Sequence, residues 1–129
     1  MKCLRKQRRC KRESGSRSTY YGKDSYNIYQ FPPEAIGLVM TTFLNPGDEV
    51  LIPDPAYLAY PACVSIAHGV PVLVPTYAKD EFRLTVEELE KKVTPKTKAI
   101  LIGYPNNPTG TIMDRASLEK VAAFAKAHD

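Results

Sequence analysis

Apolar residues from residue 34 onward repeat with the period of amphipathic helices. Between Glu34 and Leu44 they recur at i, i+3, i+4, i+7 and i+8, which predicts a helix with one apolar face made of Ile36, Val39, Met40, Phe43 and Leu44. A second helix is predicted with Asp54 as its cap, Pro55 at its first position and Gly69 as a left-handed end. A last helix is predicted to open at Asp114, with an apolar face made of Leu118, Val121, Ala122 and Ala125.

Short apolar runs between these helices predict three strands. They are Glu49–Ile52, cut off by Pro53; Val70–Pro75, whose prolines favour an edge or irregular position; and Lys98–Tyr104, expected to be the most buried. Before the third strand, Thr85 and Glu88 match a capping box, which predicts a short helix ending near Val93. Strands that alternate with helices indicate an α/β fold, with a mostly parallel sheet flanked by helices.

The charge is uneven along the chain. Eight of the eighteen basic residues fall in the first seventeen positions, where only Glu13 opposes them. From residue 18 on, thirteen acidic residues face ten basic ones. Residues 1–32 also lack a clear hydrophobic period, so we predict that they form a separate basic segment, disordered or read in a shifted frame. The folded part is then residues 33–129, and no apolar run is long enough to span a membrane.

The cysteines do not indicate a disulfide framework. Cys3, Cys10 and Cys63 are odd in number and not closely paired. With only two histidines, the chain has no zinc-binding spacing, and we expect no metal site. We expect a reducing, cytoplasmic environment, with Cys63 as a small buried apolar residue.

The segment Tyr104–Gly110 (YPNNPTG) is the strongest chemical signal in the sequence. It follows a predicted strand, and in open α/β sheets ligands bind beyond the carboxyl ends of the strands. Two asparagine amides held by a rigid proline can present a hydrogen-bond donor at a fixed place. The same residue types are also the commonest turn residues, so the heptapeptide alone is compatible with a plain turn.

The heptapeptide resembles the Asn-Pro-Thr-Gly signature of class I/II, fold-type I aminotransferases. Four more segments resemble the family in order and separation: Asn45–Leu51, Pro55–Tyr60, Gly69–Val72 and Leu89–Ile102. The resemblance covers residues 33–129. It implies an incomplete large domain of an enzyme that uses pyridoxal 5'-phosphate (PLP). The implied reaction is transamination between an amino acid and a 2-oxo acid, and the implied full-length assembly is a homodimer.

The resemblance implies a cofactor-binding role for two residues. Asn107 matches the asparagine whose amide donates to the phenolic oxygen of the cofactor, which tunes the ring as an electron sink. Tyr57 matches the aromatic residue that stacks on the pyridine ring. The Asn107–Pro108 peptide bond is expected to be cis, as in relatives of this type. Asn106 is the weaker candidate for the amide role, and Tyr60 is expected to pack as part of the wall.

The sequence also departs from the family pattern. In relatives, the Schiff-base lysine, the acidic partner of the pyridine nitrogen and the substrate-binding arginine all lie after the region that ends here at Asp129. We therefore predict no catalytic residue in residues 1–129 and no activity of this chain alone. The Gly/Ser-rich turn that holds the cofactor phosphate in relatives is replaced by Phe31–Pro33, in which two prolines lack an N–H.

Three other interpretations remain open. Lyases and synthases of the same fold share these motifs, and the residues that decide the reaction are outside this chain. The basic segment could bind nucleic acid through phosphates, although no aromatic stacking platform accompanies it, or it could be a targeting sequence. The chain could also be a non-catalytic remnant of an aminotransferase gene.

Overall fold

The computed structural model describes residues 32–128. The predicted basic segment 1–32 lies outside them except for Pro32, so its separation from the folded part stays a prediction. Along the chain the elements are α2 (Pro32–Phe43), β1 (Glu49–Asp54), α3 (Ala59–Ile66), β2 (Val70–Pro75), a 3₁₀ turn η3 (Ala78–Asp80), α4 (Val86–Glu90), β3 (Thr97–Ile100) and α5 (Arg115–Ala127). No helix among these residues is long and apolar enough to cross a membrane.

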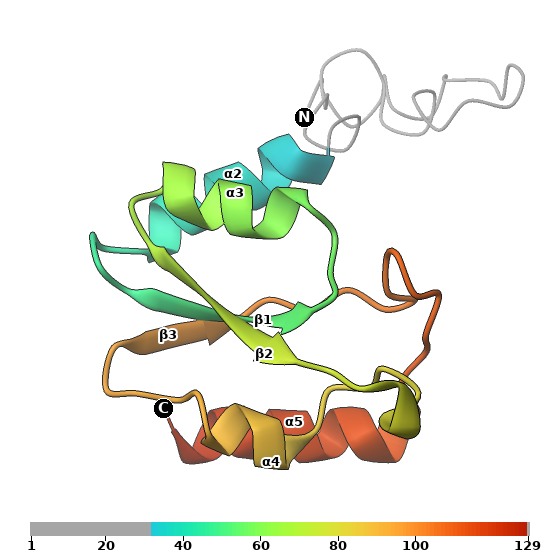
Figure 1. Cartoon of the computed structure of the whole chain (residues 1–129). Helices are drawn as coiled ribbons and strands as arrows, with labels where there is room; N and C mark the ends of the chain where they lie inside the picture. The colour runs from blue at the N-terminus through green and yellow to red at the C-terminus, as the bar shows by residue number, and fades with distance from the viewer. Residues whose placement is uncertain (1–31, 129) are drawn as a thin grey trace, which may run out of the picture.

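The three strands form a parallel sheet in the order β2-β1-β3. Strand β1 pairs along its whole length with β2, from Glu49 opposite Val70 to Asp54 opposite Pro75. The order confirms the predicted parallel sheet, and within residues 32–128 the proline-containing strand β2 lies at an edge, one of the two positions predicted for it. Because all three strands run the same way, the loops that follow them emerge at one edge of the sheet (Figure 1).

Helices cover both faces of the sheet, which makes a three-layer α/β/α sandwich (Figure 1). Successive side chains of a strand point to opposite faces, and the core follows this alternation along β1. Val50 and Ile52 pack with residues of α2 and α3, while Leu51 packs with residues of α4 and α5. Burial of both faces of β1 explains its run of consecutive apolar residues.

The first strand is longer than predicted, and the helix after it starts later. Pro53 does not end β1, because pairing with β3 stops at Leu51, and at Pro53 the strand has a neighbour only on the β2 side. Asp54 is not a helix cap. Its carbonyl accepts hydrogen bonds from the Thr76 N–H and hydroxyl, both at 2.9 Å, which holds it in the strand. Helix α3 begins at Ala59, so residues 55–58 are a loop.

The predicted left-handed residue at the end of α3 is off by one position. His68 has φ 63°, whereas Gly69 is not in the left-handed region. Gly69 instead lies in a tight space, since a Cβ there would lie 2.7 Å from Leu44 Cδ1 and 3.2 Å from the Asp48 carbonyl oxygen. The glycine therefore lets the turn after α3 approach the end of α2 closely.

Four predictions for α4 and β3 are also wrong in detail. Helix α4 ends at Glu90, and the Thr85 side chain makes no capping hydrogen bond. Strand β3 ends at Ile100, and its residues are half-buried or exposed, so β1 rather than β3 is the buried strand. Within residues 32–128, β3 has a neighbour only on its β1 side, which leaves its other side less covered.

The apolar faces of α2 and α5 are narrower than predicted. On α2, Met40 and Leu44 are buried, but Val39 is exposed and Phe43 is 65% exposed. On α5, Val121 and Phe124 are buried, whereas Leu118, Ala122 and Ala125 are exposed. The predicted start of α5 is confirmed: Asp114 is its N-cap and accepts a hydrogen bond from the Ser117 N–H at 2.7 Å, which lowers the pKa of the Asp114 carboxyl group.

Candidate functional site

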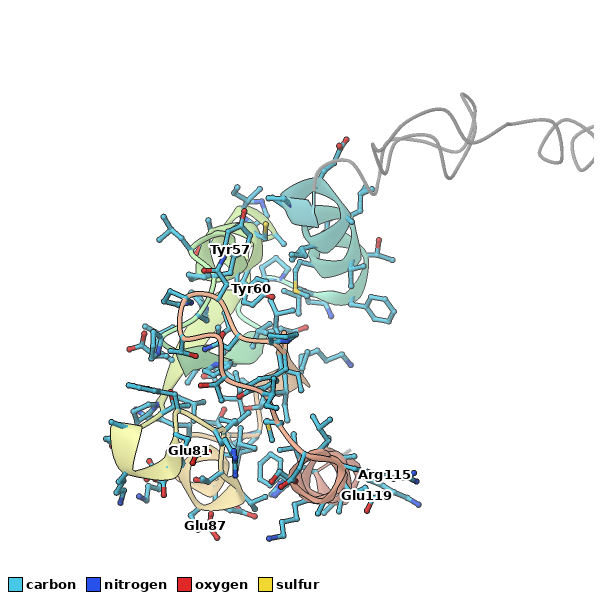
Figure 2. The ribbon with its side chains drawn as sticks, turned by 90° about the vertical axis from the view of Figure 1, so that its right-hand side faces the viewer. Tyr57, Tyr60, Glu81, Glu87, Arg115 and Glu119 are labelled. Atoms are coloured by element: carbon cyan, nitrogen blue, oxygen red, sulfur yellow. The ribbon has the colours of Figure 1, made fainter. Side chains whose placement is uncertain are left out.

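The loops that follow β1 and β3 lie together at the carboxyl edge of the sheet, which Figure 2 views face on. One loop carries Tyr57, and the other carries Asn106 and Asn107. They are joined directly, because the Asn106 side-chain amide donates a hydrogen bond of 2.9 Å to the carbonyl oxygen of Pro55. Asn106 and Pro55 are fifty-one residues apart in the sequence. The two segments that the sequence analysis identified are therefore neighbours in the fold.

Asn106 is the buried centre of its loop, with only 5% of its surface exposed. Its Nδ2 also lies 3.0 Å from the Thr109 hydroxyl oxygen. Its backbone N–H donates to the Thr111 carbonyl at 2.8 Å, and its carbonyl accepts from the Gly110 N–H at 2.7 Å. A buried amide with these partners fixes the loop conformation, since leaving such groups unpaired is costly.

Asn107 has the opposite environment: it is exposed. The peptide bond between it and Pro108 is cis, as predicted. The asparagine that the family resemblance assigns to the cofactor is thus the accessible one, while its neighbour holds the loop.

Tyr57 is half-buried in the loop before α3. Its ring lies 5.6 Å from that of Tyr60, at an interplanar angle of 89°, an edge-to-face contact that restrains both rings. Figure 2 shows the pair beside the loop after β3. Gly103 makes room for this arrangement, because a Cβ at that position would lie 2.2 Å from the Tyr60 hydroxyl. Tyr60 is therefore half-buried between Tyr57 and Gly103, and its expected lack of contact with a ligand stays a prediction.

The loop after β3 is also held by hydrogen bonds to the segment between η3 and α4. The Thr111 hydroxyl donates to the Glu81 carbonyl at 2.8 Å, and the Leu84 N–H donates to the Tyr104 hydroxyl at 3.2 Å. Burial raises the pKa of Tyr104, an effect that the hydrogen bond from Leu84 partly offsets. Glu81 and Phe82 both have positive φ, at 53° and 55°, so the turn that offers this carbonyl is itself unusual.

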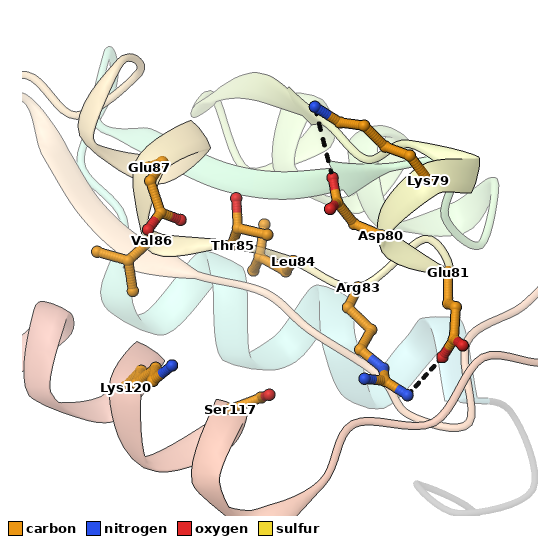
Figure 3. Close-up of a pocket in the computed structure, with 10 residues that line it drawn as sticks. All are labelled: Lys79, Asp80, Glu81, Arg83, Leu84, Thr85, Val86, Glu87, Ser117 and Lys120. Atoms are coloured by element: carbon orange, nitrogen blue, oxygen red, sulfur yellow. Dashed lines mark hydrogen bonds and ion pairs between the residues drawn. The ribbon is translucent and has the colours of Figure 1, made fainter.

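A cavity of about 350 Å³ opens elsewhere, between the segment that contains η3 and helix α5 (Figure 3). Its charged lining is balanced, with the three cations Lys79, Arg83 and Lys120 and the three acids Asp80, Glu81 and Glu87. Arg83 pairs with Glu81 across the cavity rim. None of the candidate cofactor residues lines this cavity, so it is separate from the Tyr57–Asn107 site.

The start of α2 is where the family resemblance places the turn that holds the cofactor phosphate. Pro32 and Pro33 occupy the first two positions of this helix. Proline is favoured there, but it has no N–H to offer an anion. The backbone donors that would bind a phosphate at this helix end are therefore missing at two positions.

Sequence reasoning missed the residues that hold the site together. Asn106 was considered only as a rival ligand, and Thr109, Thr111 and Gly103 were not considered at all. A signal was present in Thr109, because a threonine three residues after an asparagine in a loop can accept from its amide. The bonds to Pro55 and Glu81 span long distances in sequence and carry no local signature.

Comparison with known proteins places the chain in a family. The profile of the aminotransferase class I and II family matches residues 33–129, so the chain belongs to this family, as the motifs implied. Over 90 residues it is 53% identical to aromatic-amino-acid aminotransferase 2 of Thermococcus litoralis, covering 70% of this chain and 23% of the relative. Over 96 residues it is 50% identical to an aspartate aminotransferase of Pyrococcus abyssi, covering 74% and 25%.

Solved structures show the same fold. An aromatic aminotransferase from Pyrococcus horikoshii OT3 superposes with a TM-score of 0.74 at 48% identity, over 75% of this chain and 26% of that one. The aspartate aminotransferase of Thermus thermophilus gives 0.72 at 38% identity, over 74% and 25%. The domain is therefore part of the fold-type I aminotransferase architecture. The chain spans about a quarter of the length of the relatives it matches.

Proposed function

We propose that this chain is part of an enzyme that transfers an amino group between an amino acid and a 2-oxo acid with PLP as cofactor. The observation that carries the proposal is the Asn106-anchored loop, which presents Asn107 at the sheet edge where Tyr57 also lies. The family is generally PLP-dependent, and the matched relatives carry the names of aromatic and aspartate aminotransferases. A homodimer and a cytoplasmic location are part of the proposal; the free, buried Cys63 agrees with a reducing compartment.

The side chains present fit a part of the cofactor site. Asn107 is exposed on a loop held at both ends, so its amide can donate to the phenolic oxygen of a pyridine ring. Tyr57 offers an aromatic surface supported by Tyr60, which can fix the plane of that ring. When bound, the cofactor supplies an electron sink for bonds at the substrate α-carbon. The residues of this chain orient the ring, and we assign the proton transfers to residues outside it.

The ring contacts can be tested in the chain itself with pyridoxine 5'-phosphate. This probe keeps the ring, the phenol and the phosphate but lacks the aldehyde, so it cannot react with surface lysines. We expect weak binding, on the order of millimolar, with chemical-shift changes centred on Tyr57 and Asn107. Asn107→Ala should weaken binding roughly three- to tenfold through one lost hydrogen bond, and Tyr57→Leu by a similar factor through lost stacking.

Matched controls separate these contacts from general effects. Asn45 and Tyr77 are exposed residues of the same types outside the site, so Asn45→Ala and Tyr77→Leu should leave the affinity unchanged. Equal weakening by the control substitutions, or shifts centred away from Tyr57 and Asn107, would refute the assignment. Phosphate alone, titrated in parallel, shows how much of the signal comes from the anion rather than the ring.

The reaction itself needs a longer product. Sequencing the DNA on both sides of this reading frame, in all three frames, shows whether a lysine and an acidic residue at the family positions follow. A product that contains them should convert an amino acid and a 2-oxo acid into their exchanged partners. If the longer product eliminates a group from the amino acid or decarboxylates it instead, the enzyme is a lyase and not a transaminase. If no frame carries the family sequence, the remnant hypothesis holds.

A further inference from the structure

We propose that Asn106 is the positioning residue of the cofactor site: its amide sets the distance between the loop that carries Tyr57 and the loop that carries Asn107. This inference rests on the proposed function, because it assigns Asn106 a role at the same site. Asn106 does not contact the cofactor in this proposal. It acts through its neighbours.

The geometry of the amide carries the argument. An asparagine amide has two N–H donors, and the two partners of Nδ2 lie on different loops. One is the Pro55 carbonyl at 2.9 Å, two residues before Tyr57. The other is the Thr109 hydroxyl at 3.0 Å, two residues after Asn107. One planar group therefore fixes both loops at once.

Burial makes this connection specific. Asn106 is 5% exposed, so water cannot easily replace its partners. Its backbone groups are also used, by Thr111 and Gly110, and Thr111 continues the connection to the Glu81 carbonyl. The chain of bonds runs from the loop after β1, through Asn106, to the turn before α4. A rigid support of this kind is what a binding site needs to hold its contacting groups in place.

Substitutions of Asn106 should consequently weaken two ring contacts together, those of Tyr57 and Asn107. If the loops separate, Tyr57 and Asn107 can no longer engage one ring at the same time. A residue that only stabilised the fold would lower stability without changing how these two contacts depend on each other. The dependence between sites is measurable as non-additivity in a double-mutant cycle.

The test uses variants that keep the shape of a side chain and remove its hydrogen bonds. Asn106→Asp keeps the outline of the side chain but replaces both donors by acceptors. Thr109→Val removes the hydroxyl that accepts from the Asn106 amide at 3.0 Å and from the Thr111 N–H at 3.3 Å, and Thr109→Ser retains this hydroxyl. Binding of pyridoxine 5'-phosphate is measured for each variant in the 129-residue chain, alone and combined with Asn107→Ala. Hydrogen exchange of the Asn106 and Gly110 amides is followed without ligand.

We expect Asn106→Asp to weaken binding roughly tenfold in the parent chain, but only about threefold when Asn107 is already alanine. Thr109→Val should weaken it roughly threefold, and Thr109→Ser should restore most of the affinity. Equal weakening in both backgrounds, or no rescue by serine, would overturn the positioning role. If Asn106→Asp does not fold, the Thr109 pair decides.

The exchange measurement separates this inference from the proposed function. In the parent chain the backbone N–H groups of residues 106 and 110 should be protected from hydrogen exchange. Asn106→Asp should speed their exchange by roughly tenfold or more. If Asn106→Asp binds the ligand as the parent chain does and its backbone amides exchange at the same rate, the site is real and Asn106 does not support it. Protected amides without ligand shifts at Tyr57 and Asn107 mean that the loop is anchored but that the proposed function, and with it the positioning role, is wrong.

Discussion

Replacing Leu51 with alanine is expected to lower the free energy of unfolding by roughly 2–5 kcal/mol. Leu51 is fully buried at the centre of β1, between β2 and β3, and it packs against the α4–α5 side of the sheet. The change removes apolar contact and leaves a cavity that a central strand cannot close by moving. Urea unfolding, followed by far-UV circular dichroism, measures the effect as a lower midpoint with an unchanged slope.

A matched leucine on the neighbouring strand provides the control. Leu73 of β2 lies one register position further, opposite Ile52, but it is 46% exposed. Leu73→Ala should cost less than about 1 kcal/mol, because much of its side chain is already in water. Similar losses for the two variants would contradict the placement of β1 as the buried centre and β2 as the edge.

The fold was largely predictable because its apolar pattern is local. Helix α2, strands β1 and β2 and the start of α5 were each placed from residues within one element, and the alternation of strands and helices predicted the parallel sheet. The errors occur where a distant partner decides. Asp54 stays in β1 because Thr76 binds its carbonyl, and β3 ends early beside a single neighbour. Neither fact is visible in the residues next to the boundary.

The candidate site divides in the same way. Asn107 and Tyr57 were found because they match a family signature, and the structure places them on two loops that are joined at the carboxyl edge of the parallel sheet. The role of Asn106 depends on the Pro55 carbonyl, a backbone group that any residue type offers. Sequence alone could not find this contact, since a backbone acceptor leaves no trace in residue identity. The turn at the position of the family's phosphate-binding turn differs again. Its lack of two backbone N–H donors follows directly from the residue types Pro32 and Pro33.

A second large loss of stability is expected from Phe124→Ala. Phe124 is buried on α5, packs in the cluster that contains Leu51, and lies 4.4 Å from the His128 ring, measured between ring centroids. Truncation of a buried phenylalanine to alanine typically costs about 3–5 kcal/mol. Because small domains are only marginally stable, the variant is expected to be partly unfolded at room temperature. Phe124→Leu keeps most of the volume and should cost about 1–2 kcal/mol, which keeps the effect measurable.

A comparison of Leu118→Ala with Phe124→Ala shows which face of α5 packs against the rest of the domain. The hydrophobic pattern alone put Leu118, Val121, Ala122 and Ala125 on the packed face, but in the structure Leu118 is 39% exposed and Phe124 is buried. Leu118→Ala should therefore cost less than about 1 kcal/mol, far less than Phe124→Ala. Urea midpoints of the two variants, measured side by side, test this order. A larger loss for Leu118→Ala would mean that α5 is rotated about its axis, and that the face predicted from the sequence is the packed one after all.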